Sequence, residues 1–403
     1  MALARLRPLR GLRAIRRAYS THRLEVPVID LAGSDAAVAS EVASACEEWG
    51  FFQVVNHGVD AGVTARWEAQ MRAFFALPTA EKAAIRRHAG NARGFFDDEL
   101  TKQKRDWKEA LDFGVTPSRD WSLADGDAAN ANLDGFNQFP PASRLPAFRP
   151  AMHAYFDACT SLAERLTEIF ALGLGLPRDH FTEGERLREA HTSYLRMNYY
   201  PTCAEPGEPP PLGISPHKDA GFLTVLKQDD DCHSLQVRRR GAPDDDWSTV
   251  HPVPGALTVN TGDMAQASPP ARPRPRAAVA TSRPPSAAQV WSNDRYHAPE
   301  HRVLTSPDKV RYSAPYFYNP GYATTVAPSP THGAPRYAPV VWGYFRAQRF
   351  AGDFADFGTE IQISDFAATD SWHVANQARF VDEVDFEKPF SLEENRRLLS
   401  REA

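Results

Sequence analysis

The second half of the chain is divided into short β-type runs, and this pattern constrains the fold more than any other feature of the sequence. Each run is rich in apolar and β-branched residues, and Pro, Gly or Asp turns separate the runs, which lie at 192–197, 223–226, 234–237, 256–260 and 313–318. Many short strands with such turns between them are typical of a β-barrel or a jelly roll. The chain has 403 residues, 42% of them hydrophobic, so it can bury a substantial core around these strands.

Helical patterns lie before and after this β region. Apolar residues recur every three or four positions over 38–46 and over 148–170, and Gly173 closes the longer pattern. A further helical segment is expected over 374–384, and residues 51–55 are expected to form a buried strand. These features predict a mainly β fold with flanking helices, of the α+β class.

Changes in composition divide the chain into five segments. Residues 1–24 form a basic leader. The other four segments are a helical and strand region, a long packing helix, a jelly-roll domain and a C-terminal segment that covers the core, over residues 25–140, 141–190, 191–325 and 326–403.

The leader has the composition of a transit peptide. It contains no acid, and its seven arginines, which stand among Leu, Ala and Ile, are Arg5, Arg7, Arg10, Arg13, Arg16, Arg17 and Arg23. The sequence Arg17-Ala18-Tyr19-Ser20 resembles a mitochondrial processing site. We therefore expect import into the mitochondrion; the alternatives are a chloroplast address or a basic tail on a cytoplasmic protein.

One segment interrupts the jelly-roll domain. Residues 267–289 contain six prolines, seven alanines and four arginines with no acid, so they cannot bury enough apolar surface to order themselves. Ala265-Gln266 precedes the segment and Ala288-Gln289 ends it, so its excision restores continuous sequence without a seam. We expect an insertion outside the functional fold, such as translated intron sequence or a mistaken gene model; the alternative is a real loop that contacts a partner.

Charge and cysteine usage exclude several classes of partner. The formal net charge of -5 and a pI near 6.2 do not predict nucleic-acid binding, and no run of about 18 apolar residues predicts a membrane span. The four cysteines lie far apart with no C-x-x-C pair, which favours reduced thiols over a disulfide framework or a zinc site. We expect a monomer that acts on a small molecule.

Three residues carry the chemistry. His217 and Asp219 are separated by one residue, so on a strand they face the same side and can present an imidazole and a carboxylate to one ion. A third ligand from another strand, His301, would complete two imidazoles and one carboxylate, the facial triad of oxygen-activating Fe(II). His297 lies only four residues before His301, but it lacks the His-Arg-Val context.

A second constellation follows ten residues after His301. Arg311 and Ser313 place a guanidinium and a hydroxyl on one strand face, and such a pair can bind a carboxylate. Asn198 and Tyr200 add polar groups with the same period of two residues, upstream of the His-x-Asp pair.

Seven short motifs follow one another along the chain. They are Trp49-Gly50-Phe51-Phe52 with Asn56-His57-Gly58, Asn198-Tyr199-Tyr200-Pro201, His217-Lys218-Asp219, Asn260-Thr261-Gly262-Asp263, Trp291-Ser292-Asn293-Asp294-Arg295-Tyr296, His301-Arg302-Val303 and Arg311-Tyr312-Ser313. In this order they resemble the plant- and fungal-type 2-oxoglutarate/Fe(II) dioxygenases of the isopenicillin N synthase-like superfamily. The resemblance covers nearly everything after residue 24.

The resemblance implies a double-stranded β-helix core, Fe(II) as the metal, and 2-oxoglutarate and O2 as cosubstrates. It assigns the iron to the His-x-Asp pair and the distant histidine, with no catalytic residue beyond the metal centre. It assigns the distal carboxylate of 2-oxoglutarate to Arg311 and Ser313, with Asn198 and Tyr200 nearby. Phe317 matches a position that lines the substrate pocket.

The implied reaction oxidises a C–H bond of a small organic molecule and gives succinate and CO2. Hydroxylation is the expected outcome, and desaturation or ring closure differ only in what the substrate does next. Two alternatives stay open. One is an oxidase of the same fold that does not use 2-oxoglutarate, as in isopenicillin N synthase and aminocyclopropane carboxylate oxidase. The other is an inactive binding protein, if the insertion disrupts the site.

The charged stretch 97–109 mixes both signs, and we expect it to form a solvated face. In the superfamily such a region can also lie over the mouth of the pocket. His57, in a turn after the strand at 51–55, is expected to be a hydrogen-bonded structural group, and Asp263 a turn residue.

Overall fold

The computed structural model describes most of the chain after residue 24. The described ranges are 25–101, 104–182, 187–188, 190–204, 211–265, 291–293, 295–328, 334–354, 361–367 and 371–399. The leader and the segment 267–289 lie outside these ranges.

Mitochondrial import therefore stays a prediction, which imaging of a fluorescent protein fused to residues 1–24 would test.

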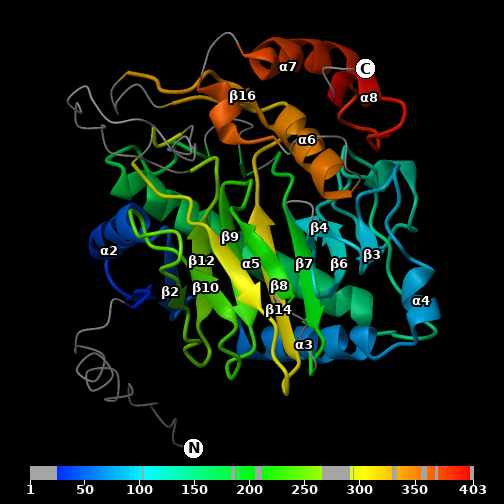
Figure 1. The fold of residues 1–403 in the computed structure, drawn as a ribbon. Coiled ribbons are helices and arrows are strands. Elements are labelled where there is room, and N and C mark those ends of the chain that lie inside the picture. Colours follow the sequence, from blue (N-terminus) through cyan, green and yellow to red (C-terminus); the bar gives the residue numbers. More distant parts are fainter. Residues whose placement is uncertain are drawn as a thin grey trace, which may run out of the picture.

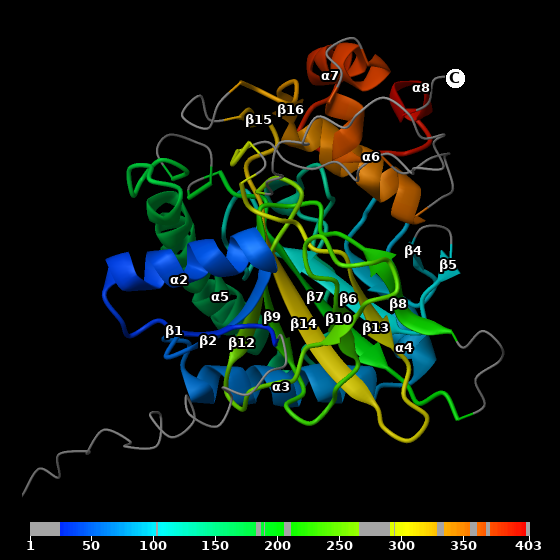
Figure 2. The same cartoon turned by 60° about the vertical axis from the view of Figure 1, so that its left-hand side comes forward.

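Two sheets face each other and form a jelly-roll core with flanking helices, as the sequence predicted (Figures 1 and 2). The larger has eight strands, in the order β1 (Val28–Asp30), β2 (Phe51–Val55), β12 (Leu257–Thr261), β9 (Leu223–Gln228), β14 (Arg311–Tyr318), β7 (Tyr194–Tyr200), β6 (Glu109–Gly114) and β3 (Gly94–Phe96). The smaller has four, in the order β11 (Ser248–Thr249), β10 (Leu235–Val237), β13 (His301–Leu304) and β8 (Leu212–His217).

Strand β1 pairs in parallel with β2 at the edge of the larger sheet, and the other neighbouring strands of that sheet pair antiparallel. Pro27 stands just before β1 and fits an edge position, because proline cannot donate a ladder hydrogen bond. Two small ladders complete the described strands: β4 (Leu100–Thr101) with β5 (Lys104–Arg105), and β15 (Thr325–Val326) with β16 (Val340–Val341).

Helix α5 (Phe148–Gly173) lies across one face of the larger sheet, and α2 (Asp35–Glu48) and α3 (Ala61–Phe75) pack against it (Figure 1). The periodic residues of α5 are buried, which confirms the predicted long helix: Met152, Phe156, Cys159, Leu162, Leu166, Ile169 and Phe170. Helix α2 ends before Gly50, whose φ of +62° is a left-handed conformation that glycine adopts without strain.

The remaining helices were only partly expected. The predicted helix over 374–384 corresponds to α7 (Trp372–Glu383), which lies with α6 (Trp342–Phe354) and α8 (Arg396–Leu399) beyond one end of the strands (Figure 1). Sequence patterns predicted neither α6 nor α3, and α4 (Thr79–Ala83) is a single short turn. Among these helices α6 bears most on function, because its side chains reach the functional site.

All four cysteines are buried and free, at Cys46, Cys159, Cys203 and Cys232. Burial raises the pKa of the Cys46 thiol well above its ordinary value and raises the pKa of Cys159 to about 12. None of the helices in the described ranges combines the length and apolarity needed to cross a bilayer.

The two ends of the inserted segment lie side by side in the fold. The backbone N–H of Trp291 donates to the carbonyl of Met264 over 3.4 Å, and the Ser292 hydroxyl donates to the carbonyl of Ala265 over 2.5 Å. Residues separated by more than twenty positions are therefore already joined by hydrogen bonds, so a two-residue connection is long enough to span the junction.

We predict that deletion of 267–289 leaves the melting temperature, the iron stoichiometry and the 2-oxoglutarate turnover equal to or higher than those of the full chain. A long loop adds little closure cost, about 0.6 kcal/mol per doubling of length, so the gain in stability should be small. A Gly/Ser replacement of equal length is the matched control. Lower values than the full chain in all three measurements would contradict the prediction.

Candidate active site

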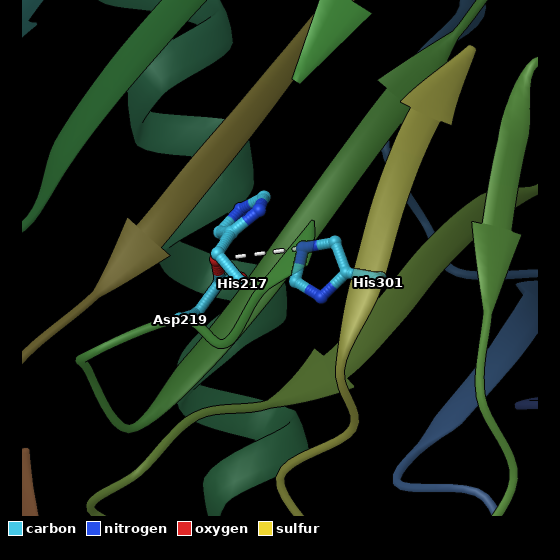
Figure 3. Close-up of side chains that lie close together, drawn as sticks. All are labelled: His217, Asp219 and His301. Atoms are coloured by element: carbon cyan, nitrogen blue, oxygen red, sulfur yellow. Dashed lines mark ion pairs between the residues drawn. The ribbon is translucent and has the colours of Figure 1, made fainter. Parts of the chain in front are cut away.

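Three side chains that could together hold a metal ion converge between the two sheets (Figure 3). His217 ends β8 and His301 begins β13, and these two residues lie opposite each other in the antiparallel pairing of the strands. The Asp219 Oδ1 atom lies 3.7 Å from the His217 Nε2 and 3.6 Å from the His301 Nε2. The predicted triad is therefore brought together, although Asp219 lies just beyond the end of the strand.

Both imidazoles are oriented by the backbone. The His217 Nδ1 lies 2.8 Å from the carbonyl oxygen of Ser215, and the His301 Nδ1 lies 3.2 Å from that of Pro299. Donation of the Nδ1 proton to a carbonyl leaves the Nε2 lone pair directed at the common point, as a metal-binding histidine requires. Desolvation and the neighbouring His301 lower the pKa of His217 to about 3, which favours the neutral ligand form.

The carboxylate of Asp219 is held by two side chains. Its Oδ2 accepts hydrogen bonds from the Thr224 hydroxyl at 2.6 Å and from the Asn260 amide at 2.7 Å, and Oδ1 is left to face the imidazoles. Burial opposes ionisation, but the two histidines and these two hydrogen bonds keep the pKa of Asp219 below its ordinary value. Thr224 and Asn260 thus complete the centre, and sequence reasoning gave neither of them this role.

The Asn-Thr-Gly-Asp motif also supports the loop that carries Asp219. The backbone N–H of Asp263 donates to the carbonyl of Asp219 over 2.7 Å, and that of Gly262 donates to Phe222 over 3.0 Å. A Cβ at Gly262 would lie 2.2 Å from the carbonyl oxygen of Gly221, so the two turns approach too closely for any side chain. Asp263 is accordingly a turn residue, as expected.

One cavity joins the metal centre to the carboxylate-binding residues. Alternate residues of three neighbouring strands line it, as the period of two predicts: Tyr194, Arg196, Asn198 and Tyr200 from β7, Thr224 and Leu226 from β9, and Arg311, Ser313, Pro315 and Phe317 from β14. Its volume is about 130 Å³, several times the roughly 10–15 Å³ that a single water needs by this measure. The predicted pocket residue Phe317 is among the lining residues.

The predicted carboxylate site lies at one end of β14. Arg311 is 2% exposed and donates to the Ser313 hydroxyl at 3.1 Å and to the Gln228 side-chain oxygen at 2.9 Å. Its guanidinium carbon lies 4.9 Å from the centre of the Tyr200 ring. Asn198 lies opposite Ser313 in the pairing of β14 with β7.

Several buried polar atoms around Arg311 have no hydrogen-bond partner among the described residues. They are the Arg311 Nε, both side-chain polar atoms of Asn198 and the Gln228 Nε2. Buried polar atoms are normally paired, and an unpaired one costs about 1–3 kcal/mol. A cluster of them beside a guanidinium fits a polar ligand such as the carboxylate of 2-oxoglutarate. Gln228 was not recognised in the sequence.

The charged stretch 97–109 is more buried than the sequence predicted. Glu99, Asp106 and Lys108 are buried, so the expectation of a solvated face is wrong for them. The Lys108 Nζ lies 2.6 Å from Glu99 and 3.0 Å from Asp106, and Arg196 on β7 pairs with Glu99 and with Asp112 on β6. Ion pairing makes this burial tolerable, and the resulting network forms one wall of the cavity.

The competing histidines take other roles. The backbone N–H of His297 donates to the carbonyl of Cys46, its own carbonyl accepts from Thr261, and its imidazole does not join the triad. His57 is half-buried, with its Nε2 3.0 Å from the carbonyl of Gly255 and its Nδ1 accepting from the backbone N–H of Val59. His57 is therefore a hydrogen-bonded structural group.

Comparison with known proteins agrees with this geometry. Residues 191–320 match the 2OG-Fe(II) oxygenase superfamily, and residues 26–142 match the N-terminal region of the non-haem dioxygenases described from morphine synthesis. This chain belongs to the 2-oxoglutarate/Fe(II) oxygenase superfamily. The match supports Fe(II) and 2-oxoglutarate as the metal and the cosubstrate, and it supports a small-molecule substrate.

Two relatives of this chain are plant oxygenases. Jasmonate-induced oxygenase 2 of Arabidopsis thaliana is 32% identical over 80% of this chain and 78% of its own length. Gibberellin 3-beta-dioxygenase 1 of Oryza sativa subsp. japonica is 32% identical over 80% of this chain and 77% of its own length.

Solved structures share the fold. The crystal structure of JOX2 in complex with 2OG, Fe and JA has a TM-score of 0.63 at 30% identity, and covers 80% of this chain and 84% of that one. The dioxygenase for auxin oxidation in rice has a TM-score of 0.58 at 27% identity, over 81% of this chain and 96% of that one.

The hydrogen bond from Asn260 to Asp219 gives a prediction. Asn260→Ala should weaken Fe(II) binding by about 10- to 100-fold, because side chains that hydrogen-bond to metal ligands contribute on this scale. Asn376→Ala, on α7, is the matched control: this buried asparagine binds the carbonyl of Leu398 instead. Anaerobic titration of Fe(II) measures the effect, and equal affinities for both variants would refute the role of Asn260.

Proposed function

We propose that this enzyme hydroxylates a small organic molecule at an Fe(II) centre held by His217, Asp219 and His301, with 2-oxoglutarate converted to succinate and CO2. The observation that carries the proposal is the convergence of these three side chains on one point inside a cavity. Both Nε2 atoms and one carboxylate oxygen face that point, and each ligand is fixed by hydrogen bonds of its own.

Fe(II) with 2-oxoglutarate and O2 would supply the oxidation of a substrate C–H bond. The residues of the chain position the metal and the substrate. The three ligands would hold the metal at the Thr224 end of β9, and Thr224 lies opposite Phe317 in the pairing with β14. Substrate in contact with Phe317 would therefore lie beside the centre.

Arg311 would bind the far carboxylate of 2-oxoglutarate. Gln228 lies opposite Ser313, and both hold the guanidinium from the side while the Tyr200 ring covers it. Arg311 is buried, so water is excluded from its contact with the carboxylate, and this strengthens the charged hydrogen bond between them. Arg311 and Phe317 are six residues apart on β14, which is roughly 20 Å of backbone at about 3.3 Å per residue. The far carboxylate of 2-oxoglutarate and the substrate would therefore be bound toward opposite ends of the cavity, on either side of the metal centre.

A same-fold oxidase without 2-oxoglutarate is the remaining alternative class. The unpaired polar atoms around Arg311 favour a bound dicarboxylic acid instead. Release of labelled CO2 from 1-labelled 2-oxoglutarate separates the two, because only the proposed reaction decarboxylates it.

We also propose that the protein is a monomer and that one chain is sufficient for activity, because the fold of a single chain brings the three ligands and Arg311 to one cavity. Gel filtration with light scattering, read beside turnover at several protein concentrations, would test this. Activity confined to a dimeric fraction would contradict it.

The ligand assignment makes the first prediction for the reaction. His217→Ala, Asp219→Ala and His301→Ala should each abolish stoichiometric iron binding and turnover, because each removes a ligand atom from the centre. His297→Ala is the control and should retain iron, since its imidazole lies outside the triad. Metal analysis and succinate formation provide the measurements. Iron loss in His297→Ala with iron retained in His301→Ala would reverse the assignment.

The variant Arg311→Lys gives the second prediction for the reaction. A lysine keeps the charge but loses the planar fork that reaches Ser313, Gln228 and a carboxylate together. The apparent affinity for 2-oxoglutarate should fall by about 1–3 kcal/mol, with little change in iron content. Arg302→Lys, on the outer part of β13 beside Gln236, is the control. An unchanged 2-oxoglutarate affinity in Arg311→Lys would argue for the oxidase that does not use this cosubstrate.

A further inference from the structure

A second arginine reaches the cavity from outside the sheets. Arg346 lies on α6, which crosses beyond the ends of the strands (Figure 2), and its side chain lines the same cavity as the metal centre. Its side chain is 11% exposed, and its Nε lies 3.1 Å from the carboxylate of Asp134. No role in binding iron or 2-oxoglutarate falls to this residue.

The hydrogen bonds of Arg346 leave most of its donors available. A guanidinium has five N–H groups. Within the described residues, Asp134 receives the Nε, while neither Nη atom donates to a protein group. Neither Nη is among the fully buried polar atoms without a partner, and the side chain lines the cavity, so these donors are available to a ligand there.

Three other cations of the cavity have more of their donors engaged by protein groups. Arg196 uses all three nitrogens on Asp112 and Glu99. Lys108 lies between two carboxylates, and Arg349 donates to two backbone carbonyls and lies 3.6 Å from Asp263. Arg346 therefore differs from these three in presenting free guanidinium donors to a ligand.

An apolar wall leads from the metal centre to Arg346. The rings of Phe317 and Tyr194 stack with their centres 4.6 Å apart, and the Arg346 guanidinium lies 5.0 Å from the centre of the Tyr194 ring. Trp342, one turn earlier on α6, also lines the cavity. Phe317 is at the opposite end of β14 from Arg311, so this wall and the 2-oxoglutarate residues do not compete for the same molecule.

We propose that Arg346 binds a carboxylate of the substrate, and that the substrate is a small acid whose apolar body lies against Phe317 and Tyr194. The two free Nη atoms match the two oxygens of a carboxylate, and the aromatic wall matches an apolar body between that group and the oxidised carbon. The proposal rests on the proposed function, because it places the oxidised carbon at the iron centre.

The test compares acids with their neutral amides. Full-length protein is loaded with Fe(II) and saturating 2-oxoglutarate under argon, so that Arg311 is occupied and no turnover occurs. Calorimetric titration then measures the affinities for 4-phenylbutanoate against 4-phenylbutanamide, and for indole-3-acetate against indole-3-acetamide. We expect the acid of at least one pair to bind at least tenfold more tightly than its amide.

Substitutions test whether Arg346 causes the preference for the acid over its amide. Arg346→Gln should remove this preference, and Arg346→Lys should keep part of it. Arg379→Gln, which affects an exposed arginine of α7 paired with Glu383, should leave it unchanged. Because Arg346→Gln leaves Asp134 buried without its partner, the double variant Arg346→Gln/Asp134→Asn removes both charges and serves if the single variant does not fold.

Two results would overturn the proposal. One is no preference for the acid in the unaltered protein, including the absence of binding by all four compounds. The other is a preference that survives in Arg346→Gln or in the double variant. Iron content and 2-oxoglutarate affinity are measured in the same samples: normal values with no acid preference reject this proposal alone, whereas loss of either in the unaltered protein rejects the proposed function.

Discussion

The antiparallel pairing of β8 with β13 is the interaction on which the site depends. It sets His217 opposite His301 across two backbones that come from distant parts of the sequence. A slip of one residue would turn an imidazole to the other face of the sheet. The pairing shifts register just after His301, and β10 pairs with β13 from the other side. Irregular pairing of this kind re-aims side chains near functional sites, and the second neighbour holds β13 in place.

Local patterns were sufficient for much of this fold. The period of α5 and the sequence of β2 predicted those elements closely, and the His-x-Asp spacing identified two ligands. Gln228 and Thr224 escaped notice because nothing in their neighbourhood marks them. They acquire a role only when β9 pairs with β14, which sets Gln228 opposite Ser313 and Thr224 opposite Phe317. Which residues lie opposite each other depends on the register between strands that are distant in the sequence, and local patterns do not show this register.

The buried ion-pair network shows a different limit. Glu99 and Lys108 stand in a stretch of mixed charge that is typical of solvated surface. The pairing of β6 with β7 sets Asp112 opposite Arg196, and Arg196 reaches Glu99 as well. Each charge is thus buried with a partner from another element, and the cost of desolvation is offset by pairing. A sequence alone gives no sign that these partners will meet. Helix α6 and its arginines escaped prediction in the same way, since their role depends on where the helix lies.

The burial of the cysteines has a consequence for an iron enzyme that handles dioxygen. Side reactions at such a centre expose the protein to oxidants, and the thiolate is the form of cysteine that peroxide attacks. Cys46 and Cys159 are enclosed by the packing of α2 and α5, and their raised pKa values keep almost all of each side chain as the thiol at neutral pH. The hydrophobic core therefore also protects the enzyme chemically against its own reaction.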